Sequence, residues 1–358
     1  MKKERDDNME TTIYRDETGF NELALEWDTL LHDSHADTIF MSHMWQTTWW
    51  HHLGEGDLKI LAVRDDQDVL VGLTSLFHVP PVLSNAEGPV LSNEGHEGRA
   101  MLRTVGCVDV SDYLDWIARR GQEELVFGAL LEALGQMSAD EWRTLALCNI
   151  PEDSPTLELV PRLARSRGWQ VTQAVEDKVP MFHVPSTWEA YEEMLEGKAR
   201  REMRRKMRKA GPYNGVEWYI VGPEHDLQVE VDAFIALLIK SHPEKADFMD
   251  ARNRAFFQSI ARGTFEAGQL QLAFLTLNEE RIAAYMNFIY NGRVMVYNSG
   301  LDPAAYKLSP GIVLLAHLIR QAIEDGQEIF DFLRGGESYK YDLGGQDTHV
   351  CRLTVARQ

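Results

Sequence analysis

Cysteine is scarce in this chain of 358 residues. The three that occur, Cys107, Cys148 and Cys351, show no Cys-x-x-Cys spacing, which argues against a disulfide framework and against a cysteine-based zinc site. The twelve histidines include no His-x-x-x-His pair, so we expect no metal at the functional site. This cysteine usage fits a reducing compartment, and we expect a cytoplasmic protein.

Long apolar runs are also missing. No uninterrupted apolar stretch approaches the roughly 20 residues that cross a bilayer, so we expect no transmembrane segment. The first residues, Met1 to Asp7, are charged and lack the apolar core of a signal peptide.

Positive charge is in short supply, because the formal net charge is −20. Such a field repels nucleic acid, which excludes DNA as an expected partner and makes use of a tRNA unfavourable. Residues 198–209 depart from this composition, with eight basic residues against one acid.

The chain contains a pattern that occurs twice. Residues 58–73 align with residues 270–285 without a gap, and in both copies an apolar run meets a polar turn and then a second apolar run. Turn residues between two apolar runs indicate a β-hairpin. The elements expected after each hairpin also correspond: a strand at 105–110, a helix at 122–137 and a strand at 142–148, then a strand at 294–299, a helix at 311–325 and a strand at 328–333.

This repeated order predicts a mixed α/β (α+β) fold of two similar lobes. We place the boundary near residue 180, which divides the chain into residues 1–180 and 181–358. Chance similarity between two α/β segments is the alternative.

A phosphate-rich donor needs free backbone N–H groups and positive potential, and a helix N-terminus supplies both. In the second half, Ser309 is suited to the N-cap, Pro310 to the first helical position and Gly311 to close phosphate approach. The corresponding helix of the first half opens with Glu123 and Glu124, which would repel a pyrophosphate. The donor is therefore expected in the second half. The alternative is that Ser309, Pro310 and Gly311 only form the start of a helix and bind no donor.

Residues 299–311 and 330–341 resemble the CelD-type, FemAB-like branch of the GNAT acetyltransferases. Residues 40–45, 49–50, 111–113 and the basic segment are similar to that branch as well. The resemblance implies a tandem pair of GNAT-like lobes, each a mixed, largely antiparallel sheet flanked by helices. It also implies acetyl-CoA or another acyl-CoA as donor, and a link to exopolysaccharide genes. The first lobe would shape the acceptor side without catalysis, and the second would bind acyl-CoA and carry the chemistry.

Acyl transfer from a thioester needs a base, an oxyanion donor and an acid for the thiolate. The segment from Asp331 to Tyr341 concentrates these groups. We predict Asp331 or Glu337 as base, Tyr339 as acid, and Arg334 and Lys340 as cations that neutralise phosphate or oxyanion. The competing interpretation is that Asp331 with Arg334, or Glu337 with Lys340, are ion pairs that support a turn.

Two further groups of residues have open alternatives. On the basic helix expected at residues 198–209, Arg201 and Arg205 are predicted to contact an anionic substrate. The alternatives are a helix face that is only solvated and a contact with RNA or anionic lipid. In the first lobe, Trp45, Asp112 and Tyr113 are predicted to contact the acceptor. The alternative is that the aromatic residues belong to the hydrophobic core.

The predicted function is an acyl-CoA-dependent N- or O-acyltransferase with a polar small-molecule or saccharide acceptor. The alternatives are a FemAB-type transferase that uses aminoacyl-tRNA and an inert interaction protein on the same fold. The predicted donor-binding residues are Lys307, Leu308, Ser309, Pro310, Gly311, Ile312, Arg334 and Lys340. The predicted substrate-binding residues are Trp45, Asp112, Tyr113, Arg201, Arg205 and Asn298.

Overall fold

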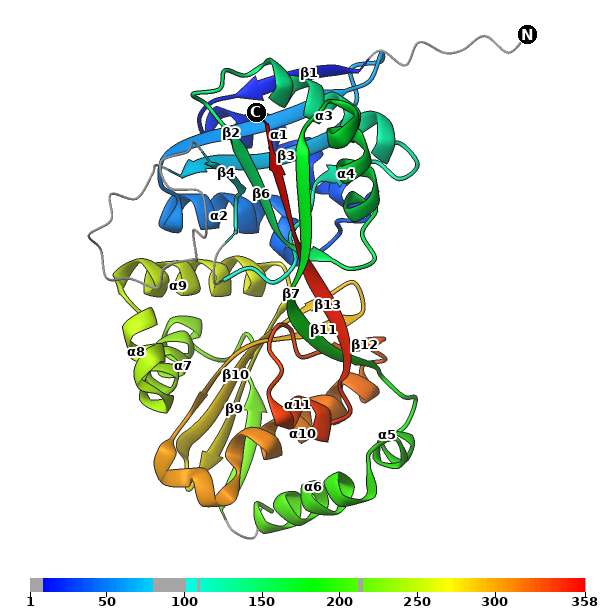
Figure 1. The fold of residues 1–358 in the computed structure, drawn as a ribbon. Helices are drawn as coiled ribbons and strands as arrows, with labels where there is room; N and C mark the ends of the chain where they lie inside the picture. Colours follow the sequence, from blue (N-terminus) through cyan, green and yellow to red (C-terminus); the bar gives the residue numbers. More distant parts are fainter. Residues whose placement is uncertain (1–8, 80–100, 108–109, 212–214, 358) are drawn as a thin grey trace. The chain divides into compact units, whose positions relative to one another are not determined.

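The computed structural model describes residues 9–79, 101–107, 110–211 and 215–357, and these divide into two compact units (Figure 1). The first unit contains the chain up to Asp177 and the segment from His349 onward. The second runs from Lys178 to Thr348. The expected division differs at the C-terminus, because residues 349–358 were assigned to the second lobe. Among the described residues, no helix is long and apolar enough to cross a membrane.

The first unit is a mixed sheet with helices. Its strands are β1 (Glu10–Tyr14), β2 (Asp57–Arg64), β3 (Leu70–Val79), β4 (Met101–Thr104), β5 (Ile117–Ala118) and β6 (Thr144–Pro151). Its α-helices are α1 (Thr18–His32), α2 (His43–Leu53), α3 (Glu123–Gln136) and α4 (Thr156–Ser166), and η1 (Ile39–Met41) is a 3₁₀ turn. The strand order is β1-β2-β3-β4-β6-β13, in which β13 (Gln346–Ala356) comes from the end of the chain and β4 and β6 pair in parallel.

The second unit repeats this design. Its strands are β7 (Gln170–His183), which enters this unit at Lys178, β8 (Val216–Ile220), β9 (Leu270–Leu277), β10 (Glu280–Tyr290), β11 (Arg293–Leu301) and β12 (Ile329–Asp331). Its helices are α5 (Trp188–Met194), α6 (Gly197–Lys209), α7 (Leu227–Ser241), α8 (Pro243–Phe248), α9 (Ala251–Glu266), η3 (Pro303–Leu308), α10 (Pro310–Glu324) and α11 (Ser338–Asp342). The strand order is β8-β9-β10-β11-β12-β7, with β11 and β12 in parallel.

The two sheets have the same topology with their last strands exchanged. In the first half of the chain β7 follows α4, yet it pairs with β12 of the second unit. In the second half β13 follows α11, yet it pairs with β6 of the first unit. This exchange is the physical reason that residues 349–358 join the first unit. The mixed α/β fold with two similar lobes is confirmed, with this one change.

Local turn chemistry explains why the hairpins were predictable. Asn278 and Glu279 both adopt positive φ between β9 and β10, and Asn291 and Gly292 do so between β10 and β11. Consecutive positive φ values define the tight turns that match the twist of paired strands. The strand expected at 105–110 is wrong, because β4 ends at Thr104 and the chain turns. Residues 108 and 109 lie outside the described part.

Cys107 and Cys148 form a disulfide in the first unit, while Cys351 is free and buried. The expectation that the cysteines would form no disulfide is therefore corrected. The pairing joins the turn after β4 to β6, two elements that are distant in sequence and adjacent in the sheet.

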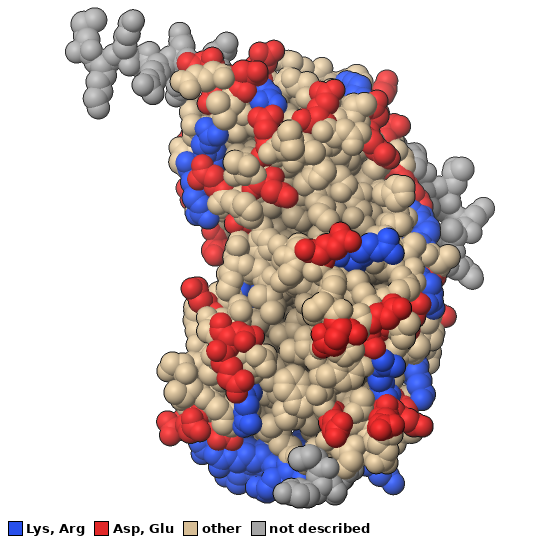
Figure 2. Space-filling model, turned by 180° about the vertical axis from the view of Figure 1, so that it is seen from behind, with Lys and Arg blue, Asp and Glu red and all other residues tan. Residues whose placement is uncertain are grey.

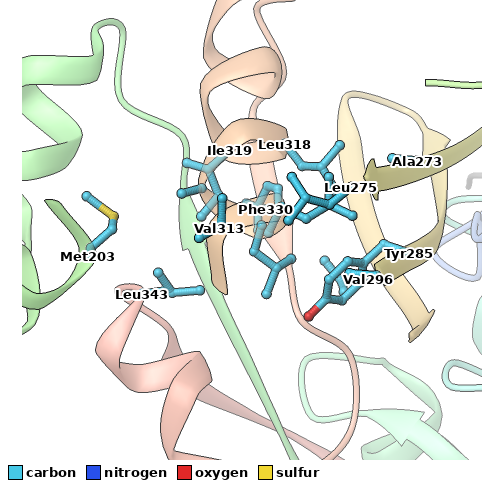
Figure 3. Packing of buried hydrophobic residues seen from close by; sticks show 14 of the residues in the cluster. Met203, Ala273, Leu275, Tyr285, Val296, Val313, Leu318, Ile319, Phe330 and Leu343 are labelled. Atoms are coloured by element: carbon cyan, nitrogen blue, oxygen red, sulfur yellow. The ribbon is translucent and has the colours of Figure 1, made fainter. Parts of the chain in front are cut away.

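A hydrophobic core cluster of the second unit packs around α10 (Figure 3). Val313, Leu318 and Ile319 of α10 pack with Phe330 of β12, and Met203 of α6 joins from the other side. All five side chains are essentially inaccessible, and each fully buried side chain of this kind contributes about 1.5–3 kcal/mol. The core therefore fixes the position of α10 relative to the strands that surround its N-terminus.

His317 is a titratable group on α10 that couples this unit to pH. Its ring stacks on Trp218 with centroids 5.0 Å apart. Burial, with the charge of Arg320 as second cause, lowers the pKa of His317 to about 4. The unfolded chain therefore binds this proton more readily than the folded one. The contribution of neutral His317 to the free energy of unfolding is complete above the ordinary pKa of about 6.5 and is lost as pH falls toward 4.

We expect His317→Gln to make the free energy of unfolding less dependent on pH. The unmodified protein should lose about 1 kcal/mol more of its free energy of unfolding between pH 7 and pH 5 than His317→Gln does, after allowance for the partial exposure of the ring. Urea unfolding of both proteins at both pH values measures the difference. Since the loss of ring stacking is the same at each pH, it cancels, and an unchanged pH dependence would contradict the assignment.

Candidate functional site

The sheet of the second unit opens where β12 ends. β12 pairs with β11 only over Arg293 to Met295, while β11 continues to Leu301. In the described part of this unit, residues 296–301 of β11 have no strand partner on the β12 side. We call these residues the open edge of β11. An extended ligand can bond to such an edge through its backbone-like amides.

Ser299 lies in the middle of the open edge, and side chains hold both of its backbone polar groups. Its N–H donates to Asn298 Oδ1 at 3.0 Å, and its carbonyl accepts from Lys245 Nζ at 2.6 Å. Both groups therefore face away from β10. Burial lowers the pKa of the Lys245 ammonium, and the nearby Glu337 opposes this.

The N-terminus of α10 follows the open edge along the chain. Ser309 occupies the N-cap position in a left-handed conformation, with φ 53° and ψ 52°. The predicted N-cap position of Ser309 and first helical position of Pro310 are confirmed, but the Ser309 side chain makes no capping hydrogen bond. Its carbonyl accepts from the Val313 N–H at 3.1 Å, and the first turn of α10 contains no acidic residue. Within the described residues, the N–H groups of Gly311 and Ile312 have no bonded acceptor.

Gly311 is needed where α10 approaches its neighbours. A Cβ at this position would lie 3.2 Å from Leu301 Cδ2 and 3.2 Å from the hydroxyl oxygen of Tyr285. Pro310 is buried, and Leu308 and Ile312 pack partly against the core. Among the predicted donor-binding residues of this segment, Lys307 is exposed. Leu308, Pro310 and Ile312 hold the turn in place through their apolar contacts.

Asp331, a predicted base, is fully buried at the end of β12. Its Oδ2 accepts from Arg293 Nη1 at 2.9 Å, and its Oδ1 accepts from the backbone of Leu333 at 2.8 Å. Leu333 has a positive φ of 56°, a conformation that is costly for leucine. These contacts favour a structural role, in which Asp331 holds the strained turn that follows the strand.

Lys340 is buried beneath the same turn. Its Nζ donates to the carbonyls of Leu333 at 3.1 Å, Arg334 at 2.6 Å and Gly335 at 3.0 Å, and Glu337 Oε2 lies 2.9 Å away. An ammonium has three N–H donors, so these carbonyls occupy all of them. The predicted contact of Lys340 with a donor phosphate is therefore not supported, and the alternative ion pair with Glu337 is present.

Two tyrosines and one glutamate complete the group. Burial raises the pKa of Tyr285 well above its usual value, as does its proximity to Tyr339, and the Tyr285 hydroxyl bonds to Ser299. Burial also raises the pKa of Tyr339, with Glu337 as second cause. Both phenols thus keep their protons at neutral pH and act as hydrogen-bond donors. Glu337 is exposed and folds back over Gly335, whose positive φ of 109° and 2.5 Å clearance favour glycine.

Comparisons with known proteins agree with this architecture. Residues 197–341 match the family profile described as "Acetyltransferase (GNAT) domain". The second unit has the fold of a GNAT acetyltransferase domain. No curated protein sequence matches the chain.

Solved structures extend the similarity over nearly the whole chain. FemX is 11% identical over 92% of this chain and 95% of its own, with a TM-score of 0.62. The C-terminal domain (DUF2156) of a putative lysylphosphatidylglycerol synthetase from Agrobacterium fabrum is 12% identical over 96% and 93%, with a TM-score of 0.54. A tandem GNAT protein from the clavulanic acid biosynthesis pathway is 10% identical over 98% and 99%, with a TM-score of 0.50. At these identities the likeness shows the fold alone.

The GNAT domain includes the basic helix. On this helix Met203 and Ala210 are buried in the core and Met207 packs partly against it. Arg201 and Arg205 are exposed, and their contact with a substrate stays a prediction.

The residues predicted in the first unit fall outside residues 197–341, which match the GNAT profile. Trp45 is fully buried and donates from Nε1 to Ser111 Oγ at 2.9 Å, which argues against contact with an acceptor. Asp112 and Tyr113 are 8% and 6% exposed, and the Tyr113 ring lies 6.2 Å from that of Phe40. The core interpretation of these aromatic residues is therefore favoured.

Three residues at the candidate site, Lys245, Tyr285 and Arg293, were not predicted from the sequence. Lys245 and Tyr285 gave no local signal, since one lies on a short helix and the other within an apolar strand. Arg293 follows the Asn-Gly turn and its spacing from Asp331 carries no motif. In the described residues no group of three or more His, Cys, Asp or Glu side chains is arranged to hold a metal.

Proposed function

We propose that the protein is an acyl-CoA-dependent acyltransferase of the CelD-type, FemAB-like kind, with acetyl-CoA as the leading donor. The observation that carries this proposal is the juxtaposition of the open edge of β11 with the uncapped N-terminus of α10 inside a GNAT acetyltransferase domain. The first feature suits the amides of a pantetheine arm, and the second suits a pyrophosphate.

The polar groups around Ser299 suit the chemistry at a thioester. In the reaction the acceptor nitrogen or oxygen forms a bond to the thioester carbonyl carbon, the carbon–sulfur bond breaks, and the thiolate and acceptor exchange a proton through solvent or a nearby base. Tyr285 and Tyr339, which keep their protons, are suited to donate hydrogen bonds to the oxyanion or the thiolate. Glu337 is the exposed carboxylate suited to receive the acceptor's proton. Much of the acceleration would come from orientation.

The acceptor proposed is a polar small molecule or a saccharide unit. Use of aminoacyl-tRNA is a second candidate, because the fold is similar to FemX. The net charge of −20 disfavours a large polyanion outside the α6 region.

Calorimetric titration of the full chain with acetyl-CoA, longer acyl-CoAs and a charged tRNA tests the proposal. We expect acyl-CoA to bind with a Kd on the order of micromolar, because charge-assisted hydrogen bonds at a helix N-terminus supply several kcal/mol. Failure of every acyl-CoA to bind would overturn the proposal, and tRNA binding alone would establish the second candidate.

A further inference from the structure

The helix α6 separates its apolar residues from its cations. Met203 and Ala210 face the core, whereas Arg201, Arg205 and Arg208 are exposed. Positions 201, 205 and 208 fall on one helical face, which we call the basic face of α6. Figure 2 shows Lys and Arg side chains gathered at the lower end of that view, where Figure 1 places α6.

Acidic partners neutralise only part of this helix. Arg204 forms two hydrogen bonds with Glu192, of 2.8 and 2.7 Å, and Arg205 forms two with Glu202, of 2.8 and 2.7 Å. No described carboxylate lies within ion-pair distance of Arg208. A cation left without a carboxylate in so acidic a chain is available to an external anion.

The C-terminal end of α6 is hydrogen-bonded to η3, the segment that leads into α10. Lys209 Nζ donates to the carbonyl of Lys307 at 2.7 Å. This contact brings Arg208 and Lys209 near Lys307, whose side chain is exposed. Lys307 lies four residues before Gly311, a separation of at most about 14 Å even in a fully extended chain. The contact between Lys209 and Lys307 therefore places the C-terminal end of α6 in the neighbourhood of the chain segment that enters α10.

We propose that Arg208 and Lys307 bind the ribose 3′-phosphate of a coenzyme A donor. This inference rests on the proposed function, because it requires an acyl-CoA whose pyrophosphate lies at the N-terminus of α10. Coenzyme A carries a third phosphate on the ribose next to that pyrophosphate. The N–H groups of Gly311 and Ile312 cannot serve both phosphate groups, so the third needs cations of its own. A chain with net charge −20 also needs local positive charge to attract a polyanionic donor.

The test compares acetyl-CoA with 3′-dephospho-acetyl-CoA, which lacks only this phosphate. We expect the unmodified chain to bind acetyl-CoA at least about tenfold more tightly, since hydrogen bonds to a charged group contribute about 1.5–3 kcal/mol. The double variant Arg208→Gln with Lys307→Gln should bind acetyl-CoA about as weakly as the dephospho compound. Its affinity for the dephospho compound should stay unchanged.

Lys198→Gln is the matched control, because it removes one exposed cation from the same helix about 15 Å from Arg208 along the helix axis. It should keep the preference for acetyl-CoA. Equal binding of both compounds by the unmodified chain, or a preference that survives in the double variant, would overturn the inference and leave the proposed function standing. Binding of neither compound would overturn both, and tRNA binding that falls in the double variant would assign these cations to tRNA phosphates instead.

Discussion

Gly311→Glu is expected to weaken acyl-CoA binding by at least about 100-fold. The added carboxylate would lie at the N-terminus of α10, where it would bond to the free N–H groups and repel a pyrophosphate. A loss of 100-fold corresponds to about 2.7 kcal/mol, which is about the value of one or two charge-assisted hydrogen bonds. Titration of the purified variant with acetyl-CoA measures the effect.

Two controls separate charge from steric effects. Gly311→Ala adds only the Cβ, which lies 3.2 Å from Leu301 Cδ2 and from the Tyr285 hydroxyl, so a small shift of these groups should preserve most of the affinity. Gly128→Glu places the same charge on α3, where a Cβ meets nothing within 4 Å, and binding should not change. If the alanine variant loses as much affinity as the glutamate variant, the loss is steric and the phosphate site is not supported.

The elements of the second unit were predictable because local signals agree there. The turn at Asn278 and Glu279 separates two apolar runs, and the sequence around Pro310 marks the start of α10 within one residue. Ser309 occupies the predicted N-cap position, and its side chain makes no capping hydrogen bond for a local reason as well. Its left-handed backbone, with φ 53°, turns the side chain away from the N–H groups that an extended N-cap residue would reach.

Long-range pairing was the part that local patterns could not supply. The strand exchange of β7 and β13 depends on which edge each strand meets after folding, and the two strands have no signature for that choice. The same holds for side chains. Asp331 was placed correctly at a strand end, but no local spacing pointed to its bond with Arg293, 38 residues away on the neighbouring strand.

The interpretation of Lys340 shows the same limit at shorter range. Its ion pair with Glu337, three residues away, was a recognised alternative and is present at 2.9 Å. The three carbonyls that surround its ammonium come from a turn whose path depends on the positive φ values of Leu333 and Gly335. Sequence spacing contains no information on that path until the strand end and the turn are fixed together.

The second large effect is expected from the pair between Asp331 and Arg293. Arg293→Met should reduce the free energy of unfolding by about 3–5 kcal/mol, because it leaves a buried carboxylate without its cation. Asp331→Asn should cost less, about 1–2 kcal/mol, since the arginine left behind is 30% exposed and remains partly hydrated. We thus expect Asp331→Asn to be more stable than Arg293→Met.

A double-mutant cycle measured by urea unfolding tests this order. The protein with both substitutions should be more stable than Arg293→Met alone, because the unpaired carboxylate is then absent. Arg162→Met is the control, since its pair with Glu124 has both side chains more than half exposed and should contribute less than about 1 kcal/mol.

Activity distinguishes the structural role of Asp331 from the predicted catalytic one. If Asp331 holds the turn, Asp331→Asn and Arg293→Met should lower acyl transfer in proportion to their loss of stability, and activity should return when a bound donor stabilises the fold. A general base behaves differently: Asp331→Asn would then lower kcat by about 100-fold or more with donor affinity unchanged, while Arg293→Met would retain turnover. That pattern would restore Asp331 as the base and leave Glu337 without the proposed role.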